Sequence, residues 1–214
     1  MRLPAVVAAS ALLLSLAACS QRSDTVAHDL ATAPADAFMA AIAAHCGQAF
    51  EGRVVEDTPA PTGKDPFAGQ RLVMHVRGCA DPAHELRIPF HVGDDHSRTW
   101  VLTRTPNGLR LKHDHRHEDG SPDAITLYGG DSTPPGTAER QQFPADADSV
   151  AMFRRADMLA STHNTWAMEI DPDQTFVYEL TRPDGRRFRV QFDLSKPVDL
   201  PPPPWGDEAA QPAR

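Results

Sequence analysis

Residues 98–120 read RTWVLTRTPNGLRLKHDHRHEDG, and this stretch carries the clearest hairpin signal in the chain. Its Asn107-Gly108 pair is the dipeptide most typical of a tight turn between two antiparallel strands. Hydrophobic and polar residues alternate on both sides of the turn, as they do in strands with one buried face. We therefore expect antiparallel strands over residues 98–105 and 109–115.

The same alternation recurs before and after this hairpin. It predicts strands over residues 49–56, 70–77, 85–92, 124–128, 137–143, 165–170, 175–181 and 187–194. Short turns rich in Gly, Pro and Asp separate them, so neighbouring strands should run antiparallel. Helical spacing of apolar residues predicts an N-terminal helix over residues 34–45 and a second short helix over residues 147–161.

The predicted elements indicate a mainly β protein. One-sided strands in this number close best into an antiparallel β-barrel or a two-layer sandwich. The pattern resembles the up-and-down barrel of the calycin (lipocalin-like) proteins, although Gly52-Arg53-Val54 lacks the Gly-x-Trp of their first strand. From Phe143 onward the chain also resembles uncharacterised secreted bacterial proteins, a resemblance that implies no activity.

Length and charge restrict the class of protein. The chain has 214 residues, of which 41% are hydrophobic, and a formal net charge of −8. These values fit one domain with one core, which we expect at residues 34–197. The acidic balance argues against nucleic-acid binding, because proteins that bind nucleic acids present a basic face. A proline-rich tail over residues 198–214 should lie on the surface or extend freely.

The N-terminus has the pattern of a secretory signal. Arg2 gives a positive start, and the apolar run that follows ends in LAAC at residues 16–19. This ending resembles the lipobox of bacterial lipoproteins, which implies cleavage before Cys19 and acylation of that cysteine. Residues 1–18 would then be a signal peptide, and residues 19–33 a tether between membrane and domain.

The lipoprotein resemblance also implies a location. An acylated Cys19 would anchor the protein to the bacterial cell envelope, with the membrane as its first partner. Ser20 follows the cysteine, where the inner-membrane retention signal of Gram-negative lipoproteins has Asp. We therefore expect the outer membrane, with the domain facing the periplasm.

Two further cysteines, Cys46 and Cys79, follow Cys19. In an oxidising envelope an even pair favours a disulfide, and the alternative is two buried free thiols. A disulfide would tie the end of the first predicted helix to the end of the strand at residues 70–77.

Three histidines alternate at the end of the hairpin: His113, His115 and His117. On a strand they share one face with Leu109 and Leu111. Imidazole is a ligand for Zn or Cu, so one interpretation is a metal site. The other is a polar strand end that projects beyond the rim of the sheet into water.

The outward faces of the last strands carry opposite charges. Glu169 and Glu179 lie on two neighbouring predicted strands, and Arg187 and Arg189 lie on the next one. This pattern predicts cross-strand ion pairs on a solvated face of the sheet rather than a catalytic pair of carboxylates.

Four aromatic residues on inward faces are candidates for lining a ligand cavity, or for simple core: Trp100, Trp166, Phe176 and Tyr178. Motifs of common catalytic sites, such as Gly-x-Ser-x-Gly, do not occur, and no catalytic residue is predicted. We therefore expect a module that binds a small molecule or a protein partner without catalysis. The alternatives are a periplasmic metal-binding protein or metalloenzyme that uses the three histidines, and a structural envelope lipoprotein.

Overall fold

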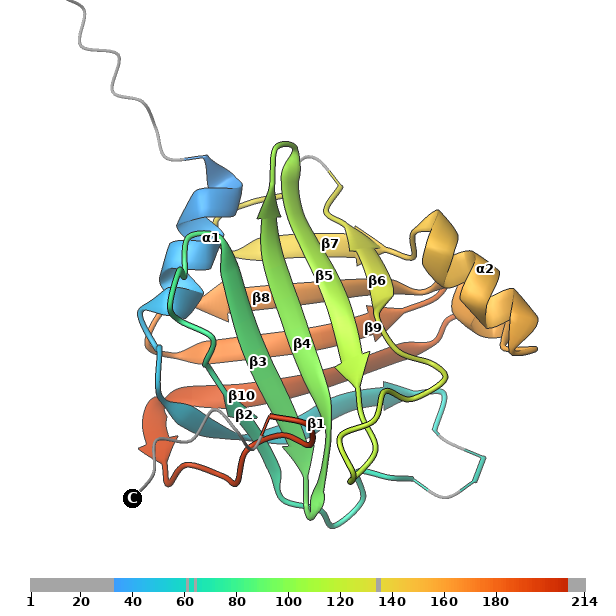
Figure 1. Ribbon diagram of the computed structural model, residues 1–214, viewed down its shortest axis with the longest axis horizontal. Helices are drawn as coiled ribbons and strands as arrows, with labels where there is room; N and C mark the ends of the chain where they lie inside the picture. The colour runs from blue at the N-terminus through green and yellow to red at the C-terminus, as the bar shows by residue number, and fades with distance from the viewer. Residues whose placement is uncertain (1–32, 61, 64, 134–135, 208–214) are drawn as a thin grey trace, which may run out of the picture. The chain divides into compact units, whose positions relative to one another are not determined.

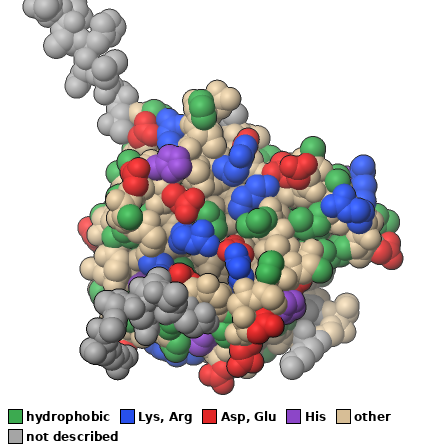
Figure 2. All heavy atoms as spheres, in the orientation of Figure 1, with side chains coloured by type: hydrophobic (Ala, Val, Ile, Leu, Met, Phe, Trp, Pro, Cys, Tyr) green, Lys and Arg blue, Asp and Glu red, His purple; other side chains and the backbone are tan. Residues whose placement is uncertain are grey.

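The computed structural model of the protein describes residues 33–60, 62–63, 65–133 and 136–207 (Figure 1). The predicted signal peptide, Cys19 and nearly all of the tether lie outside the described residues, as does the end of the predicted tail. Across the part of the chain that is described, none of the helices has the length and apolar character needed to cross a membrane. Lys, Arg, Asp and Glu side chains are interspersed over the face shown in Figure 2.

Strands dominate the described residues. The elements are α1 (Pro34–Ala43), β1 (Ala49–Thr58), β2 (Leu72–His75), β3 (Glu85–Val92), β4 (Asp95–Thr105), β5 (Gly108–His115), β6 (Tyr128–Asp131), β7 (Arg140–Pro144), α2 (Ala147–Arg155), the 3-10 helix η1 (Leu159–His163), β8 (Thr165–Asp171), β9 (Thr175–Thr181) and β10 (Arg187–Val198). The strands form one antiparallel sheet in the order β6-β5-β4-β3-β2-β1-β10-β9-β8-β7. The sheet curls into a nearly closed barrel (Figure 1), which confirms the predicted mainly β, antiparallel barrel.

The interior of the barrel holds one hydrophobic core. Alternate strand residues point inward, and Leu86, Leu102 and Leu111 on three neighbouring strands are fully buried. The helix α1 adds Phe38 and Ile42 to the same core. Phe192 of β10 belongs to this core as well, so the core is built from both ends of the chain, as a single domain requires.

The two edge strands, β6 and β7, meet along a seam. The amide of Asp146 donates to the carbonyl of Gly129 (2.9 Å), and the amide of Thr133 donates to the carbonyl of Gln142 (3.0 Å). These separate hydrogen bonds replace the regular ladder that joins the other neighbouring strands. The seam is what makes the sheet a nearly closed barrel.

The position of β6 differs from the prediction. The strand expected over residues 124–128 begins instead at Tyr128 and includes Gly129 and Gly130, which pair with β5. A Cβ atom added at Gly130 would lie only 1.8 Å from the carbonyl oxygen of Pro144. Glycine is required there because the seam brings two backbones together, whereas the sequence pattern of two glycines is typical of a turn.

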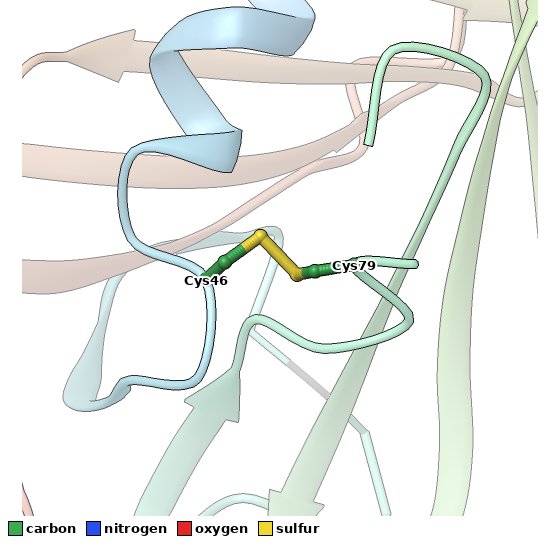
Figure 3. Close-up of a disulfide and its surroundings, with 2 residues drawn as sticks. All are labelled: Cys46 and Cys79. Carbon is green, nitrogen blue, oxygen red and sulfur yellow. A yellow bond between two sulfur atoms is a disulfide. The ribbon is translucent and has the colours of Figure 1, made fainter. Parts of the chain in front are cut away.

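A disulfide joins Cys46 and Cys79, as predicted, with 6.1 Å between the two Cα atoms. Figure 3 shows that Cys46 follows α1 and that Cys79 lies in the connection after β2. Next to this crosslink, the amide of Gly47 donates to the carbonyl of Val76 (2.8 Å). The end of α1 is thus fixed to the sheet both covalently and by hydrogen bonding.

The second helix is shorter than predicted. Asp146 caps α2 by accepting a hydrogen bond from the amide of Ser149 (2.8 Å), and α2 ends at Arg155. Asp157 follows with a φ of +56°, a left-handed conformation that ends an α-helix. The predicted helix over residues 147–161 is therefore divided into α2 and η1.

The outward ion pairs form, but the face that holds them is not fully solvated. Glu179 is only 2% exposed. Its carboxylate accepts hydrogen bonds from Arg140 (2.7 Å), Arg187 (2.9 Å) and Arg189 (2.5 Å), and these guanidinium groups hold its pKa at about 2 against the opposing effect of burial. The long arginine side chains cover the carboxylate, which explains why an outward position is buried.

The C-terminal segment packs onto the barrel as far as it is described. The strand β10 continues to Val198, beyond the predicted end at residue 194. Farther on, the amide of Trp205 donates to the carbonyl of His96 (3.1 Å), and Asp207 pairs with Arg77 (3.2 Å). The proline-rich segment up to Asp207 therefore lies on the surface rather than extending freely.

Removing the disulfide should lower the free energy of unfolding. The crosslink spans 33 positions, and closing a loop of that length stabilises a protein by about 3.7 kcal/mol in the chain-entropy treatment. We expect this loss for the double variant Cys46→Ser/Cys79→Ser in urea unfolding followed by circular dichroism. A reducing agent should bring the parent protein to the same midpoint and leave the variant unchanged; equal stability of parent and variant would contradict the prediction.

Candidate ligand pocket in the barrel

A pocket of about 180 Å³ opens between the inner faces of the barrel strands. Its lining residues are Phe67, Phe90, Arg98, Thr99, Trp100, His113, His115, Tyr128, Tyr178, Leu180, Arg186 and Phe188. Half of these side chains are aromatic, and the others include imidazole and guanidinium groups. A partly apolar cavity with a few polar groups is the usual composition of a small-molecule site.

The register of the β4–β5 hairpin sets one wall of the pocket. Trp100 lies opposite His113, and Arg98 lies opposite His115. Residues two apart on a strand share a face, so these four side chains form two adjacent rows on the inner side of the sheet. The hairpin that the sequence predicts most clearly therefore supplies five of the lining residues, these four and Thr99.

His113 forms hydrogen bonds through both ring nitrogens. Its Nδ1 lies 3.1 Å from the carbonyl oxygen of Tyr128, and its Nε2 lies 2.8 Å from the hydroxyl oxygen of Tyr178. A carbonyl only accepts, so Nδ1 carries the proton, and Nε2 accepts from the Tyr178 hydroxyl. Burial, with a smaller effect from His115, lowers the pKa of His113 to about 3, and the ring is neutral at pH 7.

His115 and Tyr128 form a second polar pair. The Tyr128 hydroxyl lies 3.0 Å from Nε2 of His115. Burial and then the charge of Arg98 lower the pKa of His115, while burial raises the pKa of Tyr128 to about 12. Both groups are therefore uncharged at neutral pH and act as hydrogen-bonding groups on the wall.

Aromatic rings form a continuous surface on the inside of the barrel. Trp100 stacks on Phe90 with 5.0 Å between centroids, and on Tyr178 with 4.5 Å. Phe188 and Phe67 lie 4.7 Å apart. Phe67 comes from the connection between β1 and β2, so a loop completes a wall that strands otherwise build.

Two arginines supply the charge of the pocket. Arg98 donates through Nη1 to Asp95 (2.6 Å), and Arg186 donates through Nη1 to Asp57. Each of the two arginine side chains remains 23% exposed, so the pocket reaches solvent on their side. The Arg186 guanidinium carbon lies 5.7 Å from the centre of the Phe188 ring, a cation–π contact.

The aromatic candidates from the sequence divide into two groups. Trp100 and Tyr178 line the pocket. Trp166 and Phe176 belong to the core behind it, where Trp166 lies 4.9 Å from the ring of His113 and Phe176 lies 6.2 Å from the ring of Trp100. The inner face was predicted correctly, but position along the barrel decides which rings reach the cavity.

The three histidines do not form one cluster. His113 is buried inside the barrel, His115 is partly buried beside it, and His117 is exposed beyond the end of β5. No group of three or more His, Cys, Asp or Glu side chains within the described ranges can hold a metal ion. The interpretation of His113 as a solvated rim residue is wrong, because the barrel closes around it and both its nitrogens have protein partners.

A larger hollow, of about 360 Å³, lies beside the start of α1 and the β4–β5 turn. Small and neutral residues dominate its lining, and Arg104, its charged side chain, is paired with Asp36 of α1. This hollow offers few groups that bind a ligand, so we regard the smaller aromatic pocket as the candidate site. Comparison with protein-family models, curated proteins and solved structures finds no match to this chain.

His113 should make stability depend on pH. The pKa of His113 is near 6.5 in the unfolded chain and about 3 in the folded protein, because burial disfavours the charged ring. The contribution of the neutral ring to the free energy of unfolding is therefore complete above pH 7, and it is lost as the pH falls from about 6.5 toward 3. Between pH 7 and pH 5 the loss is about 2 kcal/mol. We expect His113→Gln to show a smaller loss over this interval in urea unfolding.

The matched control is His84→Gln, at an exposed position in the connection between β2 and β3. This variant should keep the pH dependence of the parent protein. An unchanged pH dependence in His113→Gln would show that the buried imidazole is not responsible.

Proposed function

We propose that this protein is an envelope-anchored lipoprotein whose barrel binds a small, partly apolar molecule, and that it acts as a binding module rather than an enzyme. The pocket between Trp100, Tyr178 and His113 is the observation that carries the proposal. It combines stacked rings, which favour an apolar ligand body, with the partly exposed guanidinium groups of Arg98 and Arg186, which favour one orientation.

The internal pairing of the polar groups supports binding over catalysis. His113 uses both ring nitrogens on protein partners, and its low pKa keeps it neutral. A general base needs a nitrogen directed at the reacting group and a pKa near the working pH. The imidazole is instead suited to fixing the positions of Tyr128 and Tyr178.

The membrane anchor is proposed from the sequence alone. The LAAC sequence at residues 16–19 favours acylation of Cys19, and Ser20 favours the outer membrane with the domain facing the periplasm. The disulfide is consistent with such an oxidising compartment. On this proposal the tether to residue 33 holds the barrel near the membrane while its pocket samples the periplasm.

Ligand binding can be tested with p-cresol, an uncharged molecule of one ring. Titrated into the full chain carrying Cys19→Ser, it should cause saturable NMR shifts that include the Trp100 indole. Leu180→Phe enlarges a side chain of the pocket and should abolish the saturable shifts. Leu159→Phe makes the same change at a residue that is 60% exposed and should leave them intact. Shifts that are absent, or that persist in Leu180→Phe, would contradict the proposal.

Anchoring can be tested in a Gram-negative host that expresses the full chain. The mature protein should begin at residue 19, carry the added mass of acyl groups, and fractionate with the outer membrane. Cys19→Ser should appear in the soluble fraction without this mass, whereas Cys46→Ser/Cys79→Ser should still be acylated. An unacylated parent protein that retains residues 1–18 would overturn the proposal.

A further inference from the structure

The volume of the pocket restricts the ligand. At about 180 Å³ it falls below the 300–1,000 Å³ typical of drug-sized ligands. An engineered cavity of about 150 Å³ holds one benzene molecule. The pocket therefore fits one six-membered ring with a small substituent.

The shape of the wall favours a planar ligand. The rings of Phe90, Trp100 and Tyr178 are within 20° of parallel in successive pairs, with interplanar angles of 18° and 17°. Phe188 and Phe67 add further rings on the β10 side. Flat side chains bind flat ligands through stacked or edge-to-face contacts, each worth about 0.5–1.5 kcal/mol beyond area burial.

The charge of the lining favours an anion. The lining contains the guanidinium groups of Arg98 and Arg186 and no carboxylate. Asp95 and Asp57 pair with these arginines through Nη1 but do not themselves line the pocket. The uncharged imidazoles and phenols leave the two arginines as the charged groups of the wall.

Both arginines retain donors for a ligand. Within the described residues, the Arg98 side chain makes one hydrogen bond, from Nη1 to Asp95. Its Nε and Nη2 are therefore free to bind a ligand. Within the described part of the chain, the same nitrogens of Arg186 are also free, since its bonds to Asp57, Thr58, Pro59 and Arg187 all use Nη1. Adjacent guanidinium N–H groups match the two oxygens of a carboxylate.

We propose that the pocket selects a planar, one-ring aromatic carboxylate, with its ring against Trp100 and Tyr178 and its carboxylate bound by Arg98 and Arg186. This inference rests on the proposed binding function and specifies its ligand class. The row that contains Arg98 and His115 is the neighbour of the row that contains Trp100 and His113. A ligand whose carboxylate is attached directly to its ring therefore matches the two rows: the ring lies at the row of Trp100, and the carboxylate lies at the row of Arg98.

The test compares benzoate with benzamide, its uncharged counterpart of nearly equal shape. In NMR titrations of the full chain carrying Cys19→Ser, benzoate should bind with a Kd at least about tenfold lower than that of benzamide, since a hydrogen bond to a charged group is worth about 1.5–3 kcal/mol. Raising the ionic strength should weaken benzoate more than benzamide. This comparison requires no substitution in the pocket.

Variants then assign the preference to the arginines. Arg98→Gln and Arg186→Gln should each reduce the preference for benzoate several-fold and change benzamide binding less than about twofold. Arg110→Gln is the matched control, because Arg110 is an exposed residue that is paired with Asp131 on β6 and does not line the pocket. Thermal unfolding of each variant shows that the fold is retained.

The outcomes separate the two proposals. If p-cresol and benzamide bind but benzoate binds no more tightly, the binding function stands and the carboxylate inference is wrong. The same holds if Arg110→Gln removes the preference as strongly as the pocket variants do. If none of the three probes binds, the proposed function itself fails.

Discussion

The hydrogen bond between the His113 imidazole and the Tyr178 hydroxyl holds the interior of the barrel in one arrangement. It joins β5 and β9, which lie in opposite halves of the strand order and share no backbone ladder. A shift of one residue in the register of β5 would turn His113 outward and leave the hydroxyl buried without its partner. An unpaired buried polar group costs about 1–3 kcal/mol, so this single bond opposes alternative registers of two strands at once.

The same bond explains why the site combines apolar and polar character. Because His113 is neutral and uses both nitrogens, it brings Tyr128 and Tyr178 toward one region of the cavity without adding charge. The charge is left to Arg98 and Arg186, which reach solvent. Charge and stacking surface are thus separated along the pocket, because Arg98 and Trp100 lie on the same face of β4 but two residues apart.

Much of the fold could be predicted from alternation and turn chemistry. The hairpin around Asn107-Gly108, the strands on both sides of it, and the Cys46–Cys79 pair all follow from local patterns or from residue counts. The strand containing Gly129 and Gly130 could not be predicted, because its glycines serve a contact with the carbonyl of Pro144 that only the closed barrel creates. Burial of Glu179 depends likewise on arginines from other strands.

The site was predictable only in part, for a related reason. Periodicity places Trp100, Tyr178 and His113 on inner faces, but it does not say which residues meet across the barrel. The partner of His113 is 65 positions away in the sequence, and Arg98 looks like an ordinary polar residue at a strand end. Sequence patterns therefore reveal the faces of strands, whereas the cavity depends on their three-dimensional closure.

The β6–β7 seam gives the barrel a line of weakness beside the pocket. Among the described residues, two backbone hydrogen bonds join the strands there in place of a regular ladder, so local opening of the seam should cost less free energy than separation of a laddered pair. Tyr128 begins β6 at this line and also holds His113 and His115. Local opening of the seam would therefore loosen the wall of the cavity that carries Tyr128.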